Sequence, residues 1–193
     1  ITEISAVLSF SAIQNNDKIG VILFSDRIEK FIPPQKGRKH ILRIIRELIE
    51  FSPESSRTNI SEALKYLTNA IKKRCTAFII SDFFDQDPAS YRMNYEESLR
   101  IANNKHDIIG LQIYDPRETR LPAAGLIRLK DAETGHDIWV DSSSKRVRNH
   151  YENWWNTTYQ QIKSVFSHSG VDFVTVATDE DYVKPLISLF KRR

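Results

Sequence analysis

The segments Arg57-Thr58-Asn59 and Ala77-Phe78-Ile79-Ile80-Ser81-Asp82 decide the fold of this chain. The first opens a helix expected over Asn59 to Lys73, and the second is an apolar strand that ends in an acid. In a parallel sheet, a helix start and a strand end meet at the carboxyl edge, where open α/β sheets bind ligands. The Thr58 hydroxyl and the Asp82 carboxylate are hard oxygen ligands of the kind that Mg²⁺ prefers. The two segments therefore predict a magnesium site at this edge.

The same residues also have an ordinary structural interpretation. Asn59 and Glu62 have the spacing of a helix capping box. An Asp after a strand is common turn chemistry. Asp85 and Asp87 could hold a cation, but a role in a loop or a helix cap is the favoured explanation. Taken singly, each residue is explained more simply by local structure, so it is the order of the whole chain that favours a site.

Apolar strands alternate with amphipathic helices along the sequence. This alternation predicts an α/β, Rossmann-like fold in one domain over residues 1–193, with a mostly parallel sheet covered by helices on both faces. The expected strands are Ile19–Phe24, Ile28–Ile32, Cys75–Ser81, Ile108–Tyr114, Leu126–Leu129, Asp137–Val140 and Val171–Ala177.

Three segments depart from simple alternation. Ile28–Ile32 follows its neighbour too closely for a parallel crossover, so it is expected as an antiparallel edge strand that stops at Pro33-Pro34. Residues 121–141 are expected to form an inserted β-hairpin. A long helix from about Lys145 to His168 carries Trp154 and Trp155, and helical spacing places both in the core.

Four expected strands end in acids on the same edge of the sheet, namely Asp26, Asp82, Asp115 and Asp179. We expect a partner protein to contact this edge. The residues expected to bind it are Ser25, Asp26, Asn59 and Asp115.

Composition limits the classes of function. The net charge of +3 is too small to indicate nucleic-acid binding, and the single Cys75 excludes an internal disulfide and suits a reducing, cytoplasmic compartment. The apolar runs are far shorter than the roughly 20 residues that span a bilayer, and no signal peptide is visible. The chain begins with Ile1 inside a helical pattern, from which we expect a fragment of a longer polypeptide.

The order of a helix, Ile19–Ser25, an edge strand, the Thr58-Asn59 helix and Phe78–Asp82 resembles the von Willebrand factor type A domain. More narrowly, it resembles the bacterial domain-of-unknown-function family 58, whose genes often neighbour those of MoxR-type AAA+ ATPases. The stretch Leu121–Leu126 with Asp131–Gly135 resembles the inserted hairpin of that family. The resemblance covers essentially the whole chain.

The resemblance implies a metal-ion-dependent adhesion site. In the wider family such a site uses an Asp-x-Ser-x-Ser segment, then a Thr matching Thr58 and an Asp matching Asp82. The Asp-x-Ser-x-Ser segment has no match here, since Ser9 and Ser11 lack a preceding Asp. Full-length relatives would therefore hold Mg²⁺ or Mn²⁺, whereas this chain is expected to bind the ion weakly or not at all.

The resemblance also places the family's first strand between Ile19–Phe24 and Cys75–Ser81, and this strand would precede Ile1. Its absence would leave two unpaired strand edges in the middle of the sheet. We expect strand insertion or exchange between chains, which would give a homo-oligomer, rather than direct pairing of the two strands.

Together these features predict a non-enzymatic protein-interaction module that works with a MoxR-type AAA+ ATPase in protein assembly or activation. Two alternatives stay open. One is a Mg²⁺-dependent phosphotransfer enzyme or hydrolase on the same edge. The other is a metal-free structural domain that binds through its hairpin and its Trp-bearing helix.

Overall fold

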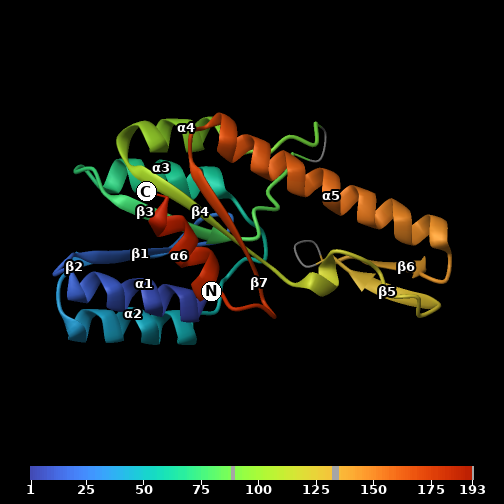
Figure 1. Ribbon diagram of the computed structural model, residues 1–193, viewed down its shortest axis with the longest axis horizontal. Coiled ribbons are helices and arrows are strands. Elements are labelled where there is room, and N and C mark those ends of the chain that lie inside the picture. Colours follow the sequence, from blue (N-terminus) through green and yellow to red (C-terminus); the bar gives the residue numbers. More distant parts are fainter. Residues whose placement is uncertain (88–89, 132–134, 193) are drawn as a thin grey trace.

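The computed structural model describes residues 1–87, 90–131 and 135–192. The helices and strands follow the expected order (Figure 1). The helices are α1 (Thr2–Gln14), α2 (Arg38–Glu50), α3 (Ile60–Ala70), α4 (Glu96–Lys105), the short 3₁₀ helix η1 (Pro116–Glu118), α5 (Lys145–His168) and α6 (Val183–Lys191). The strands are β1 (Ile19–Phe24), β2 (Ile28–Gln35), β3 (Thr76–Ser81), β4 (Asp107–Tyr114), β5 (Leu126–Lys130), β6 (Asp137–Asp141) and β7 (Asp172–Ala177).

The centre of the fold is a parallel sheet of order β3-β4-β7. Its middle strand, β4, buries a run of five residues, as a strand covered on both faces should. One face packs on a core from α3, α4 and α5 that includes Phe83, Tyr95 and Phe166. The other face packs on α1 and α6 through residues such as Ile4 and Leu189. The prediction of an α/β fold with a parallel sheet and helices on both faces is therefore confirmed.

β1 and β2 form a separate antiparallel pair, which confirms the expected antiparallel strand. Pro33 and Pro34 do not end β2, however, and the prediction that they stop the strand was wrong. β2 is an edge strand, where a missing N–H is tolerated, and the prolines lie beside an irregularity in the register. Gly20 allows this close approach, since a Cβ there would lie 2.7 Å from the Ile32 carbonyl oxygen.

Over the described residues, β1 pairs only with β2, and β3 pairs only with β4. The direct pairing of β1 with β3 that would contradict the expected strand exchange is thus not seen. Five of the six residues of β1 are only partly buried although all six are apolar or glycine. The exchange itself stays a prediction.

The predicted hairpin is present as β5 and β6, although residues 132–134 of its connection lie outside the described residues. The hairpin and the first half of α5 project from the body of the fold (Figure 1). Adjacent residues of a helix point about 100° apart, so only one of the two tryptophans of α5 faces the core, where the Trp155 ring lies 5.7 Å from that of Tyr114 on β4. Trp155 is buried, whereas Trp154 is 43% exposed, so the prediction that both are core residues was wrong for Trp154.

Candidate functional site at the carboxyl edge

The start of α3 lies at the carboxyl edge because two of its backbone N–H groups form hydrogen bonds there. The Asn59 N–H donates to the Ser25 carbonyl at the end of β1 (2.9 Å). The Ile60 N–H donates to Oδ2 of Asp85 in the loop after β3 (2.8 Å). Thr58, next to this junction, is therefore flanked by the ends of two strands that do not pair with each other.

The capping box predicted for Asn59 is half present. The Asn59 side-chain oxygen accepts from the Glu62 N–H at 2.9 Å, as a helix N-cap should. The reciprocal bond is replaced, because the Asn59 N–H is taken by Ser25. Asn59 thus has a structural role as well as its expected place at the edge.

Asp82 also lies at this edge, directly after β3, and it is exposed. Its Oδ1 accepts from the Phe84 N–H at 3.2 Å and from the Ser81 hydroxyl at 3.3 Å, which is ordinary turn chemistry. The buried Gln112 on β4 holds the same turn, since its Nε2 donates to the Asp82 carbonyl at 2.9 Å. In the described part of the chain, Asp82 Oδ2 and the Thr58 hydroxyl have no hydrogen-bond partner and can accept a ligand.

Asp85 is the residue of this edge that sequence reasoning placed least well. It is buried, and its second oxygen, Oδ1, accepts from Asn94 Nδ2 at 2.8 Å. The sequence favoured a loop or cap role for Asp85, and the structure shows a cap, but for a helix that begins 25 residues earlier. No local spacing signals such a distant cap.

The residues predicted to bind a partner are not equally available for contact. The Ser25 hydroxyl donates to Glu29 Oε1 at 2.6 Å and lies 3.3 Å from Asp26 Oδ1. This donation is the main reason that the pKa of Glu29 lies below its ordinary value. Glu29 also accepts from the Glu54 N–H at 3.1 Å, so it anchors the loop that leads to Thr58. Ser25 is therefore largely occupied by structure, whereas Asp26 is exposed.

Asp115 is engaged by its own neighbour. Its carboxylate accepts from the Arg117 guanidinium at 2.6 and 3.1 Å and from the Arg117 backbone N–H at 2.9 Å. These bonds hold the pKa of Asp115 below its ordinary value. A partner would meet an ion pair at this position rather than a free carboxylate.

The donor set fits at most part of a magnesium shell. Mg²⁺ requires six oxygen ligands in octahedral geometry. Thr58 and Asp82 could supply two, which leaves the rest to water or to a partner. Within the described ranges, no group of three or more His, Cys, Asp or Glu residues could hold a metal ion.

The Cys75–His106 contact lies at the opposite edge of the sheet. Cys75 Sγ is 3.4 Å from His106 Nδ1. Burial is the main cause that raises the pKa of the Cys75 thiol and lowers the pKa of His106. Both shifts favour neutral groups, which is the opposite of an activated thiolate–imidazolium nucleophile.

The fold and this edge define a mixed α/β domain with polar residues at the carboxyl ends of its strands. Residues 1–161 match the family described as "Protein of unknown function DUF58", and the chain belongs to that family. No helix among the described residues is both long enough and apolar enough to cross a membrane.

The chain is also similar to several mycobacterial proteins. Uncharacterized proteins of Mycobacterium bovis and Mycobacterium tuberculosis are 21% identical over 98% of the chain. The chain spans 58% of the length of these relatives. An uncharacterized Mycobacterium avium protein is 24% identical over 84% of the chain and 93% of its own length.

Two solved structures share the fold. The chain is similar to the conserved hypothetical protein BatB from Bacteroides thetaiotaomicron, with a TM-score of 0.56 and 16% identity over 99% of this chain and 87% of that one. It is also similar to an aerotolerance-related membrane protein from Bacteroides fragilis, with a TM-score of 0.59 and 13% identity over 100% and 89%. At these identities the likeness concerns the fold alone.

Proposed function

We propose that this chain is a non-enzymatic protein-interaction module of the von Willebrand factor A type, whose binding surface is the carboxyl edge of its sheet. The observation that carries the proposal is the pair of bonds from Asn59 and Ile60, which brings the start of α3 against the ends of β1 and β3. This arrangement supports a common position for Thr58 and Asp82. Within the described ranges, the Thr58 hydroxyl and Asp82 Oδ2 have no hydrogen-bond partner and are available to a ligand.

The proposed chemistry is recognition that depends on a metal ion. Thr58 and Asp82 supply two hard oxygen ligands, and a carboxylate of the partner protein completes the shell of Mg²⁺ or Mn²⁺. Two ligands hold Mg²⁺ weakly, because the ion gives up its water reluctantly. We therefore expect the ion to bind well only when the partner is present.

The proposed partner is a MoxR-type AAA+ ATPase, and the proposed compartment is the cytoplasm. The support for this partner is the resemblance to family 58, whose genes often neighbour those ATPases. The role would be the assembly or activation of other proteins. A fold does not itself give a function, so the partner has to be tested directly.

The test measures binding of the purified chain to the MoxR-type ATPase of the same organism by biolayer interferometry. We expect binding in Mg²⁺ that is lost in EDTA and is weakened by Thr58→Ala and by Asp82→Ala. The control is Glu152→Gln, which removes an exposed carboxylate from α5. Binding that is unaffected by EDTA and by both edge variants would contradict metal-dependent recognition at this edge.

A second candidate is a metal-free binding domain, and the hairpin favours it. Leu126 and Trp139 are 65% and 66% exposed on one face of the projecting β5–β6 hairpin, and Ile138 is 58% exposed on its other face. Neighbouring exposed apolar side chains such as Leu126 and Trp139 can mark a contact surface. In the same interferometry experiment, this candidate predicts that Trp139→Ser weakens binding whereas EDTA does not.

A further inference from the structure

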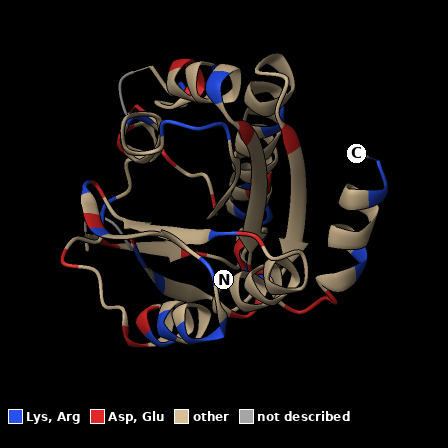
Figure 2. Cartoon of the chain, turned by 90° about the vertical axis from the view of Figure 1, so that its left-hand side faces the viewer, with Lys and Arg blue, Asp and Glu red and all other residues tan. Residues whose placement is uncertain are grey.

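The outer edge of β7 carries a groove that is separate from the carboxyl-edge site. The groove lies between α5, β7 and α6 and has a volume of about 270 Å³. In Figure 2, α6 stands beside the outer strand of the sheet, near the label C, with Lys and Arg segments in blue. The residues that define its floor and walls include Tyr159, Lys163, Phe173, Thr175, Ser188 and Arg192.

The floor of the groove is an unpaired strand edge. In the described part of the chain, β7 pairs only with β4. The Thr178 N–H, just after β7, continues this pairing by donating to the Tyr114 carbonyl, so it points toward β4. Backbone groups alternate in direction along a strand, so the N–H and C=O of Phe173 and Thr175 point outward, away from β4. Such an edge is a template on which another strand can pair.

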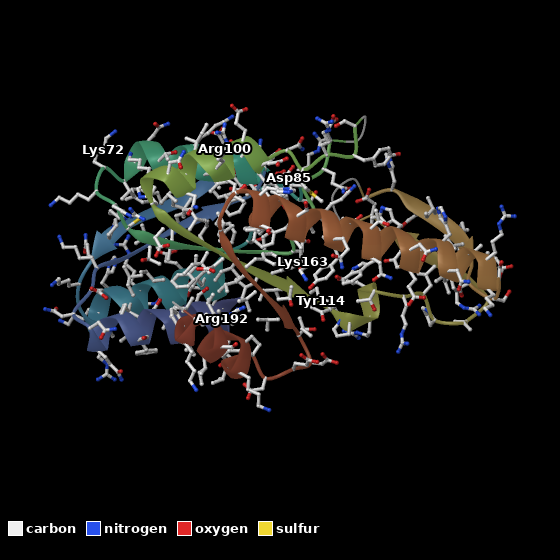
Figure 3. All side chains as sticks on the ribbon, turned by 45° about the horizontal axis from the view of Figure 1, so that its top comes forward. Lys72, Asp85, Arg100, Tyr114, Lys163 and Arg192 are labelled. Carbon is white, nitrogen blue, oxygen red and sulfur yellow. The ribbon has the colours of Figure 1, made fainter. Side chains whose placement is uncertain are left out.

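The walls of the groove are basic on both sides. Lys163 extends from α5 and Arg192 from α6, on either side of β7 (Figure 3). Lys163 Nζ lies 5.6 Å from the centre of the Tyr159 ring, and Arg192 Nε donates to the Ser188 carbonyl at 3.3 Å. Among the described residues neither cation forms a salt bridge. The nearest acids of β7 lie at its two ends, at Asp172 and in residues 179–181.

We propose that this edge binds an extended, acidic peptide segment of a partner protein, which adds to the sheet as a strand beside β7. The outward N–H and C=O of Phe173 and Thr175 supply the backbone hydrogen bonds. Successive side chains of an added strand point to opposite faces, so two consecutive acidic residues would direct one carboxylate to Lys163 and the other to Arg192. A second copy of this chain fits less well, since pairing two β7 edges would bring these cations together.

The experiment measures fluorescence anisotropy of a labelled peptide, acetyl-Thr-Val-Thr-Glu-Asp-Thr-Val-Thr-amide, titrated with the full chain. We expect saturable binding that is lost when Glu-Asp is replaced by Lys-Lys. Lys163→Glu and Arg192→Glu should each raise Kd about two- to fivefold, which corresponds to the loss of one exposed ion pair. Both residues are exposed, so these variants should fold.

A backbone variant separates strand addition from simple charge attraction. Thr175→Pro removes an outward N–H at an edge position where proline is tolerated, and Thr175→Val keeps that N–H while removing the hydroxyl. We expect the proline variant to lose binding and the valine variant to keep it, with both far-ultraviolet circular dichroism spectra unchanged. If the proline variant unfolds, the backbone is changed in the peptide instead: N-methylation of the residues beside Glu-Asp keeps the charges but blocks strand pairing, and it should abolish binding.

Several outcomes would overturn the proposal. One is that the Lys-Lys peptide binds as tightly as the Glu-Asp peptide, and another is that Kd is unchanged in both charge reversals. The proposal also fails if folded Thr175→Pro binds the peptide as well as the natural chain does. It fails too if the natural chain has a doubled solution mass that is lost in Thr175→Pro. None of these outcomes depends on Mg²⁺ or on the carboxyl edge, so the two proposals can fail separately.

Discussion

Replacing Asp85 by Asn should destabilise the protein measurably, because this carboxylate accepts two hydrogen bonds while buried. Oδ2 accepts from the Ile60 N–H and Oδ1 from Asn94 Nδ2, both at 2.8 Å. An Asn side chain has one acceptor and one donor group, so in Asp85→Asn an NH₂ group must face an N–H at one of the two contacts.

The expected magnitude follows from those two contacts. Hydrogen bonds to a charged group contribute about 1.5–3 kcal/mol, and loss of a helix N-cap costs about 0.5–2 kcal/mol. One of the two contacts survives in Asp85→Asn, so we expect a loss of about 2 kcal/mol in the free energy of unfolding. For a chain of this size that corresponds to a decrease of about 4–8 °C in Tm.

Urea unfolding followed by tryptophan fluorescence measures this change. The matched control is Asp26→Asn, since Asp26 is exposed at the same edge and should change stability by less than about 0.5 kcal/mol. The double variant Asp85→Asn/Asn94→Asp should recover part of the loss, because the carboxylate introduced at position 94 can accept from the amide introduced at position 85. A single variant as stable as the natural chain, or a double variant no better than the single one, would refute this account of the edge.

Three further predictions concern other parts of the molecule. His106 is fully buried and its pKa is lowered mainly by burial, so the unfolded chain binds more protons below about pH 6.5. The free energy of unfolding should therefore fall as pH drops below about 6.5, by up to about 1.4 kcal/mol per pH unit, and chemical unfolding of His106→Gln should show a flatter profile. Gly110→Ala should cost about 1–3 kcal/mol in a thermal melt, because a Cβ there would lie 2.4 Å from the Phe166 ring in the aromatic core. If strands exchange between chains, light scattering should give a mass above the 22.4 kDa of one chain, and a monomer with β1 paired to β3 would contradict the exchange.

The elements of this fold follow from the sequence because their signals are local. Continuous apolar runs such as those of β3 and β4 indicate buried strands wherever they occur. Asn59 and Glu62 mark the start of α3 to within one residue, since a cap acts over only a few positions. The positions of Thr58, just before the cap of α3, and of Asp82, just after β3, could therefore be predicted.

The remaining features depend on tertiary structure. The edge position of β2 was predicted, but the irregularity in its register with β1 that lets the strand continue through Pro33 and Pro34 was not. Trp154 is exposed because it points about 100° away from the buried Trp155 around α5, and the sequence does not show which of the two adjacent rings faces the core. The cap that Asp85 provides joins positions 25 residues apart, and no periodic pattern encodes such a bond.

The start of α3 has a consequence for how the candidate site is held. No ladder joins β1 to β3 in the described residues, so their relative position at this edge is not fixed by strand pairing. The two bonds that link them run through α3, from Asn59 to the end of β1 and from Ile60 to Asp85. The distance between Thr58 and Asp82 should therefore depend on α3 and Asp85 more than on the sheet. Metal-dependent recognition should then be weaker in Asp85→Asn even though Asp85 supplies no ligand, and that loss should be smaller in the Asp85→Asn/Asn94→Asp double variant.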